Sequence, residues 1–207
     1  MPKLHLLSSL ALTATLLLPG AAALAQDEAT GSAEPDAAIA ADDPRLQELE
    51  ALVPPALAGL PLDENLQSAT GEELAGVMSP EELAILEDLL MENGKTLQDY
   101  AAVATWLPIS DQQVVVLQAH RIAGVEASQT IDAWAEILSL SLTDPQVSEG
   151  FIGGRTVTLM TDGANEAAPL LHMFPALDVV WMMWADDEVL VEEAMDQVGA
   201  DEDEAAE

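Results

Sequence analysis

Two hydrophobic periodicities alternate along residues 44–198. Apolar residues recur every three or four positions after Asp43, Ser79, Ser128 and Asp186, which predicts a helix beginning near each of these residues. The clearest start is Ser79, because a proline and two glutamates follow it and complete a capping box. The sequence therefore predicts four amphipathic helices.

Strand-like apolar runs lie between the predicted helices. They occupy residues 98–107, 113–123, 155–161, 170–174 and 178–185, and residues 58–70 form a polar segment that fits an irregular stretch or an edge strand. The connections at 108–112 and 175–177 are short enough to turn the chain straight back. We therefore expect an α+β fold, with a mainly antiparallel sheet and amphipathic helices packed on one face.

The order of these elements indicates a two-half pseudo-repeat. The apolar run 114–117 precedes the helix at Ser128, much as the run 179–182 precedes the helix at Asp186. The halves would be 44–142 and 145–198. No flexible linker separates them, which favours a single domain over 44–198 with one continuous sheet, although two separate domains fit the same pattern.

Residues 1–25 have the pattern of a cleavable signal peptide. A basic start is followed by an apolar run over 10–18, and Ala23 and Ala25 stand at the positions that a signal peptidase reads, so cleavage is expected before Gln26. An uncleaved membrane anchor is the alternative, but the run is far shorter than the roughly 20 residues that span a bilayer. The n-region contains no arginine pair, so we expect export by the general secretory route to an extracellular, cell-wall or periplasmic location.

Acidic residues dominate the composition. The 207 residues include 38 Asp and Glu against 5 Lys and Arg, a formal net charge of −33, yet 50% of the residues are hydrophobic. Nucleic acid is excluded as a partner, because phosphate binding needs clustered basic residues, and an anionic lipid surface is disfavoured for the same reason. Since cysteine is absent, disulfides, thiolate metal sites and a cysteine nucleophile are excluded.

The acids are spread over three regions. Residues 26–43 and 199–207 are small, polar and acidic, and we expect a disordered linker and a disordered tail there. The region 44–198 still holds 27 acids against 4 bases. A surface of this kind repels itself at low ionic strength, so adaptation to a saline exterior is one hypothesis and an ordinary solvated surface is the other.

Candidate chemistry is sparse. The serine-hydrolase, zinc-protease and phosphate-loop motifs are absent from the sequence, and we expect no cofactor beyond weak, nonspecific divalent cation binding. His120 and His172 each lie in a predicted strand. They could bind Zn²⁺ together with a carboxylate if their strands turned them to one face, or each could be a buried, hydrogen-bonded strand histidine.

The segment 179–184 is apolar on both faces of its predicted strand. It could be a central strand covered on both sides. Alternatively, the face with Trp184 and Met182, extended by Trp106, could stay accessible and bind a protein, peptide or lipid partner.

Two functional hypotheses follow. The first is an exported, soluble, non-catalytic binding or interaction module. The second is an extracellular hydrolase that is carboxylate-based or metal-assisted. A flat apolar patch would favour binding, whereas a cleft with facing carboxylates, or with His120 and His172 beside an acid, would favour hydrolysis.

Overall fold

A computed structural model describes residues 43–110, 113–165 and 168–204. The predicted signal peptide at 1–25, the linker up to residue 42 and residues 205–207 lie outside the described residues. Among the described helices, none has the length and apolar character needed to cross a membrane.

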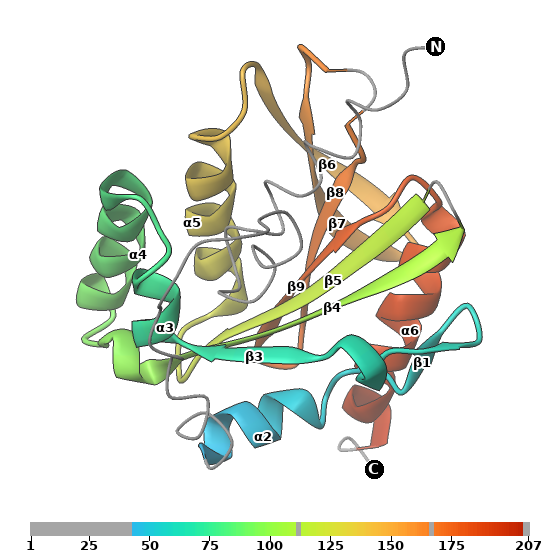
Figure 1. Cartoon of the computed structure of the whole chain (residues 1–207), viewed down its shortest axis with the longest axis horizontal. Coiled ribbons are helices and arrows are strands. Elements are labelled where there is room, and N and C mark those ends of the chain that lie inside the picture. The colour runs from blue at the N-terminus through green and yellow to red at the C-terminus, as the bar shows by residue number, and fades with distance from the viewer. Residues whose placement is uncertain (1–42, 111–112, 166–167, 205–207) are drawn as a thin grey trace, which may run out of the picture.

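A seven-stranded sheet, antiparallel at every pairing, forms the centre of the described structure (Figure 1). In spatial order its strands are β3 (Gln67–Thr70), β4 (Tyr100–Ser110), β5 (Gln113–Ile122), β9 (Val179–Trp184), β8 (Leu171–Ala176), β7 (Arg155–Asp162) and β6 (Pro145–Ile152). A small hairpin of β1 (Ala56–Leu57) and β2 (Leu60–Pro61) stands apart from it.

Five α-helices accompany the sheet within the described part of the chain. They are α2 (Pro44–Glu50), α3 (Gly71–Ala75), α4 (Pro80–Glu92), α5 (Ala127–Ser139) and α6 (Glu188–Glu204), with short 3-10 turns η3 (Asp63–Asn65) and η4 (Leu97–Asp99). The α+β class with a mainly antiparallel sheet is thereby confirmed. The capping box at α4 is also confirmed, because Ser79 Oγ accepts from the Glu82 N–H at 3.3 Å and Glu82 Oε2 accepts from the Ser79 N–H at 2.7 Å.

Helices cover both faces of the sheet, where the sequence led us to expect one. One face packs against α2 and α6 through residues such as Leu46 and Val191, and the other against α4 and α5 through residues such as Leu86 and Trp134. The physical reason is β9, whose six residues are all apolar and all buried, so that both of its faces need a covering layer. In Figure 1, α4 and α5 lie to one side of the sheet, with α2 and α6 on the other.

The two sequence halves join at the middle of the sheet. β5 comes from 44–142 and β9 from 145–198, and they pair directly, with Gln118 opposite Met182. The halves end differently, however, because α5 and α6 pack on opposite faces. The pseudo-repeat is thus one of element order, and the two helices do not occupy equivalent places.

Helix α6 extends into the segment expected to be a disordered tail. It runs to Glu204 and so includes residues 199–204. Ala200, Glu202 and Glu204 are good helix formers, Asp201 and Asp203 are weaker ones, and no proline in the segment forces the helix to end at Gly199.

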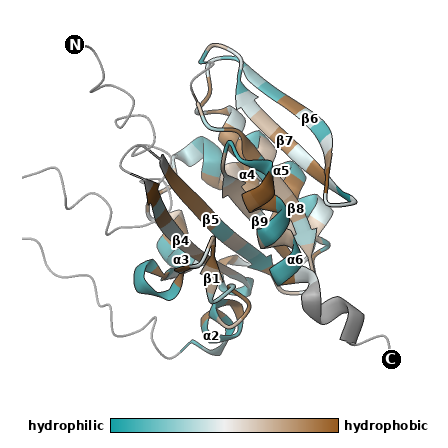
Figure 2. Cartoon of the chain, turned by 90° about the vertical axis from the view of Figure 1, so that its right-hand side faces the viewer, coloured by the Kyte–Doolittle hydropathy of each residue, from teal (hydrophilic) through white to brown (hydrophobic). Residues whose placement is uncertain are grey.

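Strand β6 forms one edge of the sheet (Figure 2). Gly153 and Gly154 connect it to β7, with φ angles of 56° and 82°. Both residues must adopt the left-handed region in a two-residue type I′ turn, which glycine does at no steric cost. This turn fixes the register of the β6–β7 hairpin, with Ile152 opposite Arg155.

Candidate functional site

His120 lies on β5 in the layer beneath α5 and is 1% exposed. Its Nε2 donates to Gln118 Oε1 at 3.1 Å, and the Tyr100 hydroxyl donates to its Nδ1. The Trp134 ring packs on the imidazole, with the ring centroids 4.5 Å apart. Burial lowers the pKa of His120 to about 3, so the ring is neutral at ordinary pH.

Tyr100 and His120 form an enclosed polar cluster with Gln118. Burial raises the pKa of Tyr100 well above its usual value, so its hydroxyl stays protonated and keeps donating. The cavity beside Gln118 and His120 measures about 10 Å³, which is room for one water molecule at most. A substrate therefore has no space next to these groups.

His172 lies on the other face of the sheet. Along β9, His120 pairs with Val180 whereas His172 pairs with Met183, and residues of opposite parity in one strand point to opposite faces. The two imidazoles therefore cannot bind one zinc ion together. Among the described residues there is also no group of three or more His, Asp and Glu that could hold a metal.

His172 is 1% exposed, and neither of its ring nitrogens has a hydrogen-bond partner among the described residues. Burial lowers its pKa, because the charged form would lose its hydration. His172 is therefore a neutral core residue on the α6 face. It cannot act as the second histidine ligand of the hypothetical zinc site at His120.

Met182 and Trp184 share one face of the sheet, as strand parity predicted, and Trp106 lies on the same face. Met182 is fully buried, Trp184 is 8% exposed, and only Trp106 is half-buried. The segment is a central strand covered on both sides. These residues therefore belong to the core and offer no open apolar patch.

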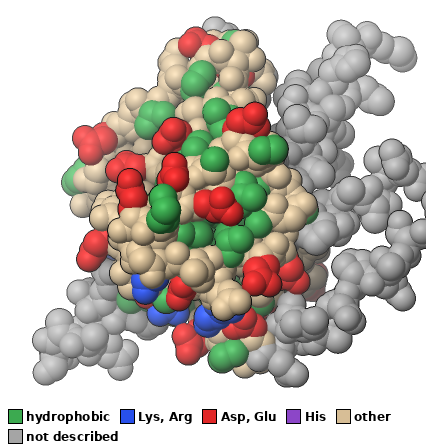
Figure 3. Space-filling model, turned by 90° about the vertical axis from the view of Figure 1, so that its left-hand side faces the viewer, with side chains coloured by type: hydrophobic (Ala, Val, Ile, Leu, Met, Phe, Trp, Pro, Cys, Tyr) green, Lys and Arg blue, Asp and Glu red, His purple; other side chains and the backbone are tan. Residues whose placement is uncertain are grey.

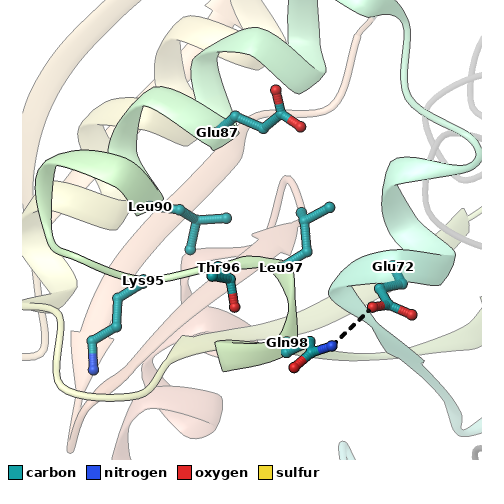
Figure 4. A pocket seen from close by; sticks show the side chains of 7 residues that line it. All are labelled: Glu72, Glu87, Leu90, Lys95, Thr96, Leu97 and Gln98. Carbon is teal, nitrogen blue, oxygen red and sulfur yellow. Dashed lines mark hydrogen bonds between the residues drawn. The ribbon is translucent and has the colours of Figure 1, made fainter.

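A depression of about 410 Å³ lies between α3, the end of α4 and η4 (Figure 4). Its lining includes Glu72, Glu87 and Lys95. Figure 4 shows that Lys95 points away from both glutamates, and the one hydrogen bond drawn across it joins Gln98 Nε2 to Glu72 Oε1 at 3.4 Å. The polar groups do not converge on a common point, so the depression has no evident ligand geometry.

An acidic groove of about 610 Å³ runs between α4 and α5. Asp88 and Glu92 line it from α4, and Asp132 and Glu136 from α5. Figure 3 shows carboxylates spread over this whole side of the molecule. Since 44–198 holds 27 acids, a gathering of this kind is expected on any of its surfaces and by itself defines no site.

The outer strand β6 is the most exposed strand of the seven-stranded sheet. Seven of its eight residues are exposed or half-buried, including Val147 at 50% and Phe151 at 73%. Large apolar side chains on an open sheet edge invite pairing with another chain, and soluble proteins usually place charges or prolines there. Pro145 and Glu149 give β6 only part of that protection.

The β6–β7 hairpin packs closely within itself and contacts α6 on one side. The Leu159 side chain crosses β6 at Gly150, where a Cβ atom would lie 2.6 Å from Leu159 Cδ1. Arg155 donates to the main-chain carbonyl of Met195 in α6, and Gly199 leaves room for its guanidinium. Val147, Glu149 and Phe151 alternate to the opposite face, so the anchored hairpin presents them outward.

The sequence did not predict β6 as a strand. Its residues 145–152 alternate poorly between apolar and polar, because both faces of the strand meet solvent for most of its length. The available signal was the Gly153 and Gly154 pair directly before the predicted strand at 155–161, since two glycines between extended runs indicate a hairpin.

Comparisons with known proteins add no family to this picture. No family model matches the chain, and neither the curated proteins nor the solved structures contain a match.

Proposed function

We propose that the protein is an exported, non-catalytic binding module that recognises a protein or peptide through the β6–β7 hairpin. The observation that carries this proposal is the exposure of Val147 and Phe151 on an edge strand whose hairpin contacts α6 through Arg155 on the opposite face. An exposed sheet edge is a known means of peptide recognition, because an extended peptide can add to it as a further strand. Export rests on the signal-peptide pattern of residues 1–25.

The burial of the reactive side-chain types supports a binding role over catalysis. His120, His172 and Tyr100 are each at most 1% exposed, so none of them can touch a substrate in this conformation. Proton transfer requires hydrogen-bond contact with the reacting group. Among the described residues, a hydrolase would have to rely on surface carboxylates such as those of the acidic groove.

The charge distribution favours a partner with a basic segment. Arg121 pairs with Asp178 at 2.8 Å, Arg155 lies 3.7 Å from Asp196, and Arg45 pairs with Asp43. These ion pairs occupy three of the four bases of 44–198, while most of the acids that the structure describes in this region take part in no ion pair. The long-range field around the protein is therefore negative and attracts cationic partners.

Site-specific photo-crosslinking tests this function. A benzoylphenylalanine placed at Phe151 in the full-length, exported protein should give a discrete adduct in the native compartment. Val189 and Met91 provide matched control positions, since each is an apolar residue exposed to 69%. An adduct specific to position 151 supports the proposal, whereas no adduct there, or the same adducts at all three positions, contradicts it.

A separate assay of polymer hydrolysis tests the non-catalytic part of the proposal. If the purified mature protein hydrolysed an extracellular polymer, and Glu136→Gln in the acidic groove removed that activity, the non-catalytic part of the proposal would be wrong. Unchanged polymer in the presence of wild-type protein, together with the adduct at position 151, supports a binding module.

A further inference from the structure

The free edge of β6 carries a repeating set of unpaired backbone groups. Ile152 and Arg155 flank the two-residue turn and form a hydrogen-bonded pair, so the antiparallel ladder alternates from there along the hairpin. Gly150 and Ser148 then bond to β7, while the N–H and C=O groups of residues 147, 149 and 151 point away from it. No described strand pairs with β6 on that side.

The side chains on those same three residues share one face and form a short pattern. Val147 and Phe151 are exposed and apolar, and the exposed Glu149 stands between them. Glu149 takes part in none of the ion pairs among the described residues. An incoming strand would therefore meet two apolar contacts and one unpaired carboxylate at alternate positions.

We infer that β6 is the docking edge for an extended basic segment of a partner protein, which adds antiparallel as an eighth strand with a lysine or arginine opposite Glu149 and apolar residues two positions to either side. This inference rests on the proposed function and specifies its partner. Backbone hydrogen bonds would supply affinity, and the cross-strand side-chain pairs would supply selectivity.

A second copy of this chain fits the edge less well. In the antiparallel register that pairs Val147 with Phe151, the two copies place Glu149 opposite Glu149, and like charges directly opposite each other destabilise a strand pair. Each copy also carries a large negative charge. Charge complementarity therefore favours a basic partner over self-association.

The other edge of the sheet does not offer an equivalent site. β3 has four residues, and Thr70 at its end caps α3. Ser68 Oγ donates to Glu50 Oε1 of α2 at 2.6 Å, so the neighbouring helix already engages this strand. By contrast, β6 can pair with an added strand through the backbone groups of three alternate residues, 147, 149 and 151.

A designed peptide tests the inference. The probe is a seven-residue acetylated and amidated peptide of threonines, with valine at positions 2 and 6 and lysine at position 4, titrated into the mature protein at low salt. Replacing the lysine by glutamate should weaken binding about three- to tenfold, from one cross-strand charge pair. Glu149→Lys should reverse this preference. The control substitution Glu87→Lys, at an exposed position of α4, changes the net charge by the same amount and should leave the preference unchanged.

Backbone methylation separates strand addition from mere side-chain contact. N-methylation of the peptide lysine removes an N–H that faces β6 and should weaken binding at least about tenfold, whereas N-methylation at position 3, whose N–H faces solvent, should change it less than about twofold. Equal effects at both positions, or failure of Glu149→Lys to reverse the charge preference, would overturn the inference. A partner crosslinked at position 151 would then leave the proposed function standing without strand addition.

Discussion

The Tyr100 hydroxyl donates a hydrogen bond to Nδ1 of His120 in the closed layer between the sheet and α5. The two residues come from neighbouring strands of the sheet and are at most 1% exposed. Since the other imidazole nitrogen donates to Gln118, the ring is fully satisfied in one neutral tautomer. The pair therefore stabilises the fold in a way that depends on its protonation state.

Tyr100→Phe should destabilise the protein by about 1–3 kcal/mol, because it leaves the Nδ1 acceptor of His120 buried without a donor. Chemical denaturation at pH 7 measures this difference. The variant should retain peptide binding at β6, which is remote in the sheet order. A variant as stable as the wild type would show that the hydrogen bond contributes nothing.

The pH dependence of stability should follow His120. Its pKa is about 3 in the folded state against about 6.5 in the unfolded chain, so the unfolded state binds the extra proton first as pH falls. The contribution is therefore fully present above pH 6.5 and is lost as pH falls from there towards 3, by up to about 1.4 kcal/mol per pH unit. His172, whose pKa is also lowered, acts in the same direction.

Unfolding curves of the wild type and His120→Gln between pH 7 and pH 4.5 check this. The variant is expected to be less stable at pH 7 but to lose less stability on acidification, since glutamine does not titrate. Parallel pH profiles for the two proteins would contradict the assignment of a neutral, buried His120.

Arg155→Met should loosen the β6–β7 hairpin without disturbing the centre of the sheet. The substitution keeps an apolar stem but removes the hydrogen bond to the Met195 carbonyl and the nearby charge of Asp196. Amide exchange should accelerate in 145–162 and stay unchanged in β4, β5 and β9. Uniform acceleration through all strands would mean that the hairpin is not a separate unit anchored at α6.

The midpoint of thermal unfolding should rise between low salt and molar NaCl. The described region holds many more carboxylates than bases, and salt screens their mutual repulsion. A melting curve against NaCl concentration measures this, with KCl as a control for ion identity. A midpoint that does not rise would remove the hypothesis of adaptation to a saline exterior.

Local signals in the sequence predicted four of the five described α-helices, but the short helix α3 was missed although Thr70 and Glu73 form a capping box at its start. The cap at Ser79 and the proline after it act within a few residues, so the start of α4 at Pro80 followed without knowledge of the tertiary structure. The paired apolar runs around 175–177 likewise predicted the β8–β9 hairpin, which the register confirms from Leu171 to Trp184.

Local sequence signals could not predict properties that depend on how the strands of the sheet are paired in register. Whether His120 and His172 share a face depends on how β5 and β8 each pair with the strand between them, and one residue of shift would reverse the answer. The presence of helices on both faces of the sheet likewise depends on β9, because this central strand is apolar on both of its faces. The candidate binding edge was missed because exposed residues leave no periodic pattern of burial in the sequence.

Amide hydrogen exchange at single-residue resolution tests the role of β6 most directly. With the lysine peptide bound, exchange at the amides of Val147, Glu149 and Phe151 should slow, while Ser148 and Gly150, already bonded to β7, should change little. If the peptide binds and the exchange rates of those three amides stay as they are in the free protein, β6 is not the docking edge.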